Sequence, residues 1–264
     1  MRFSMKFLKV NYQTEGWHET TLHTSFIYMN KKYGNMYEWI THTHNDISGK
    51  CPYQCRYCYM LKQRWKHDPT LRLNDKALKA NLGKDNTIFI GSSLDFCHPD
   101  IPTEWILKTL DHCNKYIENN LYILQTKNPG RFLEQDILNH PLMQNKEQVI
   151  LCTTIETNRD TTKISKAPTP TKRAEAMVKL SQMGFRTMVT TEPCLDFDLD
   201  EMVALLKSFK PELVNIGCNS NPGIILPEPS KEKLMALIHE LREFVPTVEL
   251  KSNSKRILGD IENV

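Results

Sequence analysis

The chain has 264 residues, of which 40% are hydrophobic and 25% charged, and its formal net charge is +3. These values suit one large α/β domain or two small ones, and the weak positive charge permits contact with a polyanion without requiring it. No apolar run approaches the roughly 18–20 residues that cross a bilayer, and the basic N-terminus lacks the apolar core of a signal peptide, so we expect a cytoplasmic protein with no membrane segment.

Short apolar segments recur along the chain with helical patterns between them. Residues 1–37 do not fit this repeat, and the Thr/His/Tyr-rich stretch Thr20–Asn30 indicates an N-terminal hairpin or cap, which leaves the repeat in residues 38–264. The predicted strands are Glu38–Thr41, Thr87–Ile90, Leu121–Gln125, Val149–Ile155, Arg186–Thr191, Glu212–Ile216 and Thr247–Leu250. The predicted helices are Tyr59 to about Lys66, Thr103–Glu118, Thr171–Met183, Leu199–Phe209 and Ser230–Phe244.

This alternation of strands and helices predicts right-handed βαβ units around a parallel sheet. We therefore expect the α/β class and a partial (β/α)6-type TIM barrel with an N-terminal cap segment. An open doubly wound sheet is the alternative, because periodicity alone does not separate the two. Active sites of β/α barrels lie at the C-terminal ends of the strands, so the residues that follow each predicted strand are the candidates for a site.

Cysteine is abundant in this chain, and three of its eight cysteines stand together, in the segment Cys51-Pro-Tyr-Gln-Cys55-Arg-Tyr-Cys58. In a reducing cytoplasm, metal binding explains such a cluster better than disulfides do. Three thiolates with this spacing can ligate three irons of a 4Fe–4S cluster and leave the fourth iron open to a ligand. A zinc site completed by His42 or His44 is the alternative.

With Tyr57 before its last cysteine, the segment resembles the CxxxCxΦC signature of the radical S-adenosylmethionine (radical SAM) superfamily. The resemblance implies that Cys51, Cys55 and Cys58 hold the cluster and that S-adenosylmethionine chelates its open iron. It also implies reductive cleavage of this cofactor to a 5′-deoxyadenosyl radical, which abstracts hydrogen from a substrate. An electron donor such as flavodoxin or ferredoxin is the implied partner.

The same resemblance assigns cofactor contacts to residues after the predicted strands. The turn at residues 91–93 looks like a variant of the superfamily's Gly-Gly-Glu-like turn without the Glu, and Thr126-Lys127 is similar to a Thr-Lys pair of the spore photoproduct lyase-like branch. A strand-ending turn, a solvated lysine and ordinary strand threonines are the plainer alternatives. The residues expected to contact the cofactor are Tyr57, Gly91, Ser92, Ser93, Lys127, Thr154 and Glu156.

The substrate is expected at the same ends of the strands. Its candidate contacts are Asp95, Glu192, Asn219 and Lys251. Three isolated cysteines just past strand ends, Cys97, Cys194 and Cys218, are candidates for returning a hydrogen atom to a product radical, although a lone cysteine commonly serves as a small buried apolar residue.

The resemblance of Thr126-Lys127 to the spore photoproduct lyase-like branch favours a nucleobase or nucleotide in nucleic acid as the substrate, as do the scattered basic loop residues and the weak positive charge. A peptide or small metabolite is the alternative. The basic loop of residues 157–171 is expected to be a lid, a polyanion contact or a solvated loop. Two other classes remain: a zinc-stabilised binding module without chemistry, and a barrel enzyme that uses its cysteines as nucleophiles.

Overall fold

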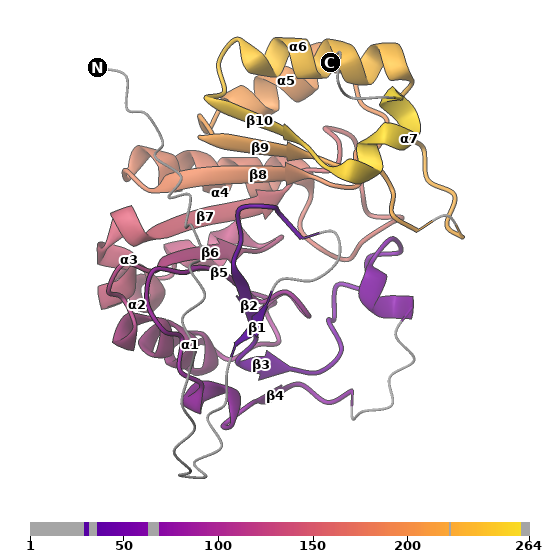
Figure 1. The fold of residues 1–264 in the computed structure, drawn as a ribbon. Helices are drawn as coiled ribbons and strands as arrows, with labels where there is room; N and C mark the ends of the chain where they lie inside the picture. The colour runs from indigo at the N-terminus through magenta and orange to yellow at the C-terminus, as the bar shows by residue number, and fades with distance from the viewer. Residues whose placement is uncertain (1–28, 32–35, 63–68, 222, 260–264) are drawn as a thin grey trace, which may run out of the picture.

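The structure is a computed structural model that describes residues 29–31, 36–62, 69–221 and 223–259 (Figure 1). An eight-stranded sheet forms its centre, with the order β1-β2-β5-β6-β7-β8-β9-β10. β1 runs antiparallel to β2, and every other neighbouring pair is parallel. The strands are β1 (Asn30–Lys31), β2 (His42–His44), β5 (Thr87–Ile90), β6 (Leu121–Gln125), β7 (Val149–Thr154), β8 (Arg186–Thr191), β9 (Leu213–Ile216) and β10 (Thr247–Leu250).

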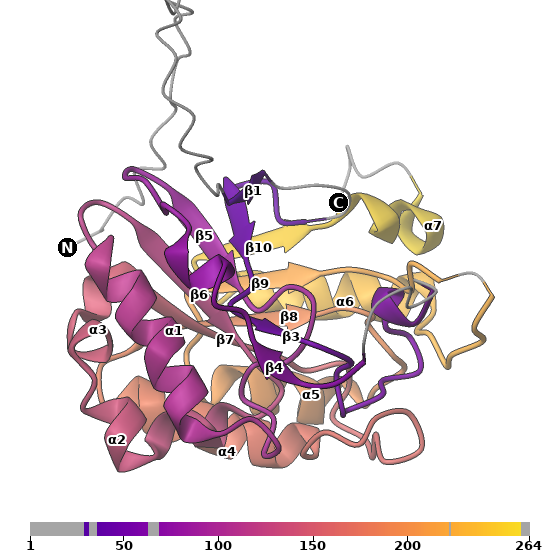
Figure 2. The same cartoon turned by 90° about the horizontal axis from the view of Figure 1, so that it is seen from below.

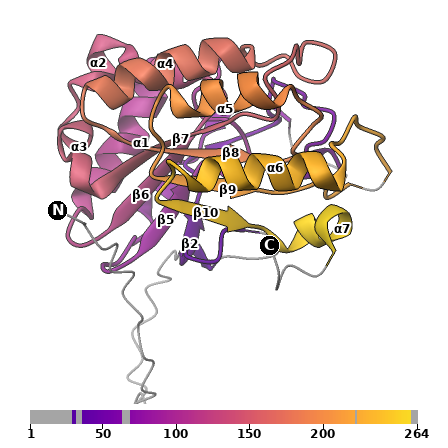
Figure 3. The same ribbon diagram turned by 90° about the horizontal axis from the view of Figure 1, so that it is seen from above.

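The helices follow the strands and form a layer along one face of the curved sheet, as the views in Figures 2 and 3 show. They are α1 (Thr103–Lys115), α2 (Gln135–Leu138), α3 (Pro141–Gln144), α4 (Pro170–Gln182), α5 (Leu199–Lys207), α6 (Lys231–Arg242) and α7 (Lys255–Leu258). Short 3-10 helices occur at Tyr59–Lys62, Ala77–Lys79, Pro129–Leu133, Lys146–Gln148 and Ser252–Ser254. β3 (Ile47–Ser48) pairs antiparallel with β4 (Arg72–Leu73) in a separate two-stranded sheet. None of the helices in the described ranges has the length and apolar character that crossing a membrane requires.

Side chains alternate between the two faces of the sheet. Ile88 and Ile90 of β5 pack in the large core under the helices, whereas Phe89 belongs to a smaller cluster on the other face. On that inner face Tyr37 and Ile40, which precede β2, cover one end of the strands. Successive side chains of a strand point to opposite faces of the sheet. Because both faces are covered here, every residue of β7 is buried.

The expected α/β class and partial barrel are confirmed, and the barrel does not close. Within the described residues no backbone pairing joins β10 to β1 or β2. Side chains bridge this seam instead: the indole Nε1 of Trp39 donates to the Glu249 carboxylate on β10 at 3.1 Å, and Lys251 Nζ lies 4.8 Å from the centre of the Tyr37 ring.

The predicted strand bounds agree with the structure for β5, β6, β8 and β10, but the first predicted strand is wrong in place. Residues 38 and 39 form a turn that Ile40 N–H closes by donating to the Tyr37 carbonyl, Thr41 N–H then donates to the Thr87 carbonyl, and the strand follows at His42–His44. The apolar residues of this segment point inward because they cover the end of the barrel: the Tyr37 and Trp39 rings stack at 5.5 Å. Apolar content alone does not distinguish such a turn from a strand.

Two other predicted elements lie partly outside the residues that the structure describes. The helix predicted from Tyr59 begins as the 3-10 helix Tyr59–Lys62, and residues 63–66 lie outside the described ranges. The expected hairpin at Thr20–Asn30 also lies outside them except for Met29 and Asn30.

Candidate active site

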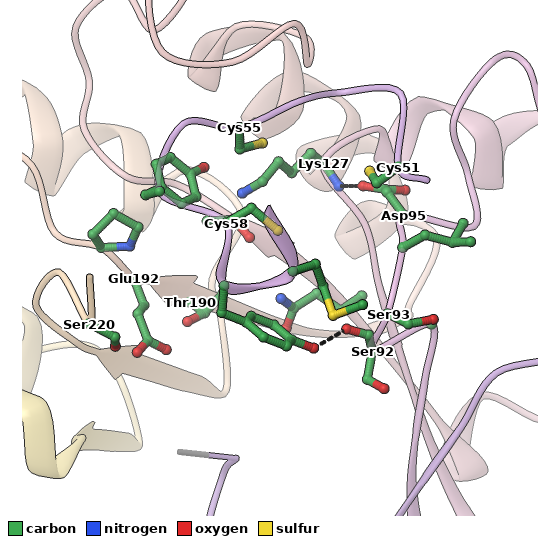
Figure 4. Close-up of a pocket in the computed structure, with 18 of the residues that line it drawn as sticks. Cys51, Cys55, Cys58, Ser92, Ser93, Asp95, Lys127, Thr190, Glu192 and Ser220 are labelled. Carbon is green, nitrogen blue, oxygen red and sulfur yellow. Dashed lines mark hydrogen bonds between the residues drawn. The ribbon is translucent and has the colours of Figure 1, made fainter. Parts of the chain in front are cut away.

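A cavity of about 540 Å³ lies where the parallel strands end (Figure 4). Successive strands contribute residues at or just beyond their last positions: Gly91, Gln125, Thr154, Thr190, Cys218 and Lys251. This is the end at which β/α barrels carry their active sites, and the volume lies within the roughly 300–1,000 Å³ of ligand pockets.

The cysteine loop forms one wall of this cavity. Cys51, Cys55 and Cys58 all line it, none of them is in a disulfide, and their side chains border a common space in Figure 4. Gly49 allows the chain to turn into the loop, since its φ is +125° and a Cβ there would lie 2.6 Å from the Thr70 carbonyl oxygen. Burial raises the pKa of the Cys51 thiol to about 11, and a bound metal would oppose this by stabilising the thiolate.

The spacing of the sulfurs distinguishes two kinds of metal site. Tetrahedral zinc with Zn–S bonds of about 2.3 Å holds its ligand atoms about 3.8 Å apart. In the described part of the chain, the one group of three metal-binding side chains whose ligand atoms lie within 4.8 Å of one another is His44, Asp46 and His112. At least one pair of the three cysteine sulfurs therefore lies farther apart than this. His44 Nε2 lies 2.8 Å from Asp46 Oδ1, away from the cysteine loop's ligand set. Three cysteine side chains outside any disulfide, with sulfurs not grouped this tightly, therefore fit an iron–sulfur cluster better than one zinc ion.

A second loop supports the cysteine loop from its outer side. Arg56 N–H donates to the Ile164 carbonyl and Lys166 N–H to the Tyr53 carbonyl, each at 2.9 Å, and the Ser165 hydroxyl lies 3.0 Å from the Cys55 sulfur. These residues belong to the basic loop after β7, and none from that loop lines the cavity. The loop therefore acts as a support, not as the lid that was one of its expected roles.

Tyr57, Lys127 and Glu156 form one network. The Glu156 carboxylate receives hydrogen bonds from the Tyr57 hydroxyl, from Lys127 Nζ at 3.0 Å and from Arg173 at 2.6 Å. Burial acts to raise the Glu156 pKa, but Arg173 and then Lys127 and Tyr57 outweigh it and hold the pKa at about 2. Glu156 is fully buried behind Thr154 and does not line the cavity, whereas Tyr57 and Lys127 do. Arg173, which lies on α4, was not among the residues predicted for the site.

The turn after β5 is shaped by its neighbours. Gly91 has φ +82°, and a Cβ there would lie 2.8 Å from the Phe96 ring. The amide oxygen of Asn45 accepts hydrogen bonds from the Ser93 backbone N–H and hydroxyl, and the Asn45 amide donates to the Ser92 hydroxyl at 3.0 Å. Both serines line the cavity. The sequence analysis did not single out Asn45 as a site residue. It directly follows β2, and the first strand was predicted at Glu38–Thr41 instead of His42–His44.

Asp95 links the loops after β5 and β6. One carboxylate oxygen accepts from the Thr126 hydroxyl and the other from the Lys127 backbone N–H, both at 2.6 Å. Burial raises the pKa of this carboxyl, although these hydrogen bonds oppose the rise. Asp95 lines the cavity, but its oxygens are engaged by the protein, so its placement fits a role in loop geometry.

The opposite wall carries a second charged group. Glu192 pairs with Lys251 at 2.7 Å and accepts from Asn253 at 2.8 Å. Asn253 also donates to the Cys218 carbonyl at 2.8 Å, which ties the loops after β9 and β10 together. Asn219 lines the cavity, but its amide donates to the Asn221 and Ile224 carbonyls and so shapes its own loop.

The structure brings most of the predicted site residues to the one cavity. Of the three isolated cysteines, Cys218 lines it, whereas Cys97 and Cys194 are fully buried and do not. Cavity residues that the sequence did not single out include Met36, Tyr37, Tyr53, Tyr59, Met60, Phe89, Gln125, Thr190 and Ser220. Several of these are apolar or aromatic, and nothing in their local sequence distinguishes them from core residues.

Comparisons with known proteins point to one fold. No family model matches the chain, and no curated protein matches it in sequence. Among solved structures, spore photoproduct lyase with bound AdoMet and dinucleoside spore photoproduct is similar at a TM-score of 0.60 and 12% identity, over 83% of this chain and 78% of that one.

Two peptide complexes are also similar. Streptococcus suis SuiB bound to its precursor peptide SuiA has a TM-score of 0.53 and 10% identity, over 78% of this chain and 48% of SuiB. The structure of anSMEcpe with bound AdoMet and a Cp18Cys peptide has a TM-score of 0.51 and 12% identity, over 79% of this chain and 62% of that one. The chain thus has the fold of radical SAM enzymes of known structure, a partial β/α barrel that stays open between β10 and β2.

Proposed function

We propose that this chain is a radical SAM enzyme, in which Cys51, Cys55 and Cys58 hold a 4Fe–4S cluster beside bound S-adenosylmethionine. The observation that carries the proposal is the placement of three cysteine side chains, none of them in a disulfide and not grouped within 4.8 Å of one another, on the wall of a 540 Å³ cavity at the strand ends of this fold. When bound, the two cofactors supply a 5′-deoxyadenosyl radical, which abstracts a hydrogen atom from a substrate in the cavity.

The chain's own residues hold and orient these groups. Tyr57, anchored on Glu156, fixes the end of the cysteine loop, and Lys127 lies beside it with Nζ 5.3 Å from the centre of the Tyr57 ring. Ser92 and Ser93 line the cavity, and their hydroxyl oxygens could accept hydrogen bonds from the amino group of a bound cofactor. Because Lys127 is already paired with Glu156, it would contact a carboxylate only as a shared cation.

A nucleobase or nucleotide in nucleic acid is the substrate class we propose. The inner wall offers aromatic faces at Tyr37, Tyr59 and Phe89, on which a base can stack, and a hydrogen-bonding group at Glu192 and Lys251 for its polar edge. Spore photoproduct lyase, whose structure holds a dinucleoside, has a similar fold. A peptide is the second candidate, since SuiB and anSMEcpe hold peptides on similar folds.

Anaerobic reconstitution with iron and sulfide tests the proposal. We expect a brown protein with about four irons and absorption near ~400 nm, and 5′-deoxyadenosine when it is reduced in the presence of S-adenosylmethionine. Cys58→Ala should lose the cluster, whereas Cys113→Ala, which changes a buried cysteine outside the cavity, should keep it. A colourless protein that retains one zinc would contradict the proposal. Deuterated oligonucleotides and peptides, compared for label transfer to 5′-deoxyadenosine, would then identify the substrate class.

A further inference from the structure

We propose that the outer side of the cysteine loop is the docking surface for an acidic electron-carrier protein. This inference rests on the proposed function and names a partner for the same site. The surface, called here the outer basic face, is a groove of about 410 Å³ lined by Lys166 and Lys172, together with Arg56 and Lys163, two exposed residues of the loops that border it. The cysteine loop and the loop after β7 lie side by side in Figure 2.

The groove and the cavity share one lining residue. Tyr53 lies between Cys51 and Cys55 in the loop, and it lines both the cavity and the groove. On the groove side its ring meets the His98 ring at 4.4 Å, and Lys166, Pro168 and Lys172 complete the wall. A protein seated in this groove therefore comes within one aromatic ring of the cavity without entering the space that the substrate needs.

The charges on this face favour an acidic partner. All four cationic residues are exposed, and within the described residues none of them forms a salt bridge. Two nearby carboxylates are partly engaged: Asp160 accepts from Thr162, and Asp100 lies 3.6 Å from His98. Unpaired surface cations of one sign attract an acidic protein, accelerate its encounter and orient it.

An electron donor fits this face better than nucleic acid does. A bound substrate strand has to reach the cavity, and the groove is a separate hollow that shares only Tyr53 with the cavity's lining. An electron needs only proximity: the reduced carrier loses one electron and is oxidised, and the cluster gains that electron and is reduced. Electron-transfer encounters are small and transient, in keeping with a shallow groove and a few charges.

The test uses the reconstituted protein and reduced flavodoxin, with bleaching of the cluster absorbance followed by stopped flow. We expect Lys166→Glu/Lys172→Glu to lower the second-order rate constant by about tenfold or more at low salt. The difference should shrink as the ionic strength rises, because salt screens exposed charges. Lys166→Gln/Lys172→Gln should give an intermediate rate.

Two controls separate docking from other effects. Lys76→Glu/Lys84→Glu makes the same change in net charge at exposed lysines outside the groove and should keep the wild-type rate. Dithionite, which needs no docking surface, should reduce the cluster equally in all variants.

Each result has one interpretation. Reduction of Lys166→Glu/Lys172→Glu by flavodoxin at the wild-type rate would overturn the docking surface while leaving the enzyme assignment intact. The docking surface would also be overturned if Lys166→Glu/Lys172→Glu lost only its affinity for an oligonucleotide, because the face would then bind nucleic acid. A wild-type protein that assembles no cluster would instead overturn the proposed function, and the docking surface with it.

Discussion

The hydroxyl oxygen of Ser165 lies 3.0 Å from the sulfur of Cys55, although 110 positions separate the two residues in the chain. The same oxygen accepts a hydrogen bond from the Ala167 backbone N–H at 3.1 Å. A thiolate ligand carries no proton, so in a cluster-bound protein the Ser165 hydroxyl would be the donor and Cys55 the acceptor.

Ser165→Ala should lower the reduction potential of the cluster, because a hydrogen bond to a ligand sulfur stabilises the more negative, reduced state. The expected shift is on the order of tens of millivolts, given that about 59 mV corresponds to a tenfold change for one electron. Ser165→Thr should retain the wild-type potential, and Ser208→Ala, at an exposed position on α5's end, should have no effect. A redox titration followed by EPR measures it; an unchanged potential in Ser165→Ala would refute the assignment.

Arg173→Met should destabilise the protein strongly. The change leaves the Glu156 carboxylate buried without its closest cation, and breaking a buried pair on one side costs about 3–5 kcal/mol. The double variant Glu156→Gln/Arg173→Met should recover part of this loss, because it removes both charges. Urea unfolding of the cluster-free protein gives the free energies; equal stability of the two variants would contradict the charge argument.

Glu156 should also make stability depend on pH in the acid range. Its pKa is about 2 in the folded protein and about 4.3 in an unfolded chain, so the unfolded state binds the proton first as pH falls. The stabilisation is complete above the unfolded value and is lost between about pH 4.3 and pH 2, a change of about 3 kcal/mol. Urea unfolding at several pH values should show this slope in the wild type and a flatter one in Glu156→Gln.

Gly217→Ala should disturb the Glu192 wall. A Cβ at position 217 would lie 2.8 Å from both Cγ and Cδ of Glu192, whose carboxylate is held by Lys251 and Asn253. We expect a loss of about 1–3 kcal/mol from this overpacking, read out as a lower melting temperature. Gly130→Ala, where the nearest atom would be 3.6 Å away, is the matched control and should differ little from wild type.

Cys218 should be the cysteine that returns hydrogen to a product radical. It lines the cavity, and burial raises its pKa to about 11, so it carries its S–H hydrogen at neutral pH. Because thiol hydrogens exchange with water, product formed in D₂O should contain deuterium, and Cys218→Ala should lower this incorporation. Cys194→Ala should match the wild type, since Cys194 does not line the cavity. Full incorporation in Cys218→Ala would exclude this role.

The sequence predicted best what local patterns control. Four strands were placed at their observed bounds because each is a short β-rich run between helical patterns, and the cysteine spacing identified the loop that faces the cavity. Contacts between distant segments could not be read this way. The sequence shows Arg173 only as one arginine of a helix, and its partner is set by the packing of α4 beside β7. It shows Tyr37 only as an apolar residue next to a predicted strand, not as one that covers the end of the barrel.

Glu156 also shows that a sequence pattern does not reveal contacts between distant segments. Its place after a predicted strand gave it a cofactor role, yet its carboxylate is used within the protein, by side chains 99, 29 and 17 positions away. A sequence pattern gives the face on which a residue lies but not which of its neighbours has already satisfied its charge.

The contact between Trp39 and Glu249 has a mechanical consequence. It spans 210 positions and joins the two margins of the sheet through one hydrogen bond, with the Lys251–Tyr37 contact beside it. Parting such a junction costs roughly 1–3 kcal/mol, far less than separating two paired strands. Among the described strands, the two edges of the sheet can therefore move apart at this seam without breaking any backbone ladder.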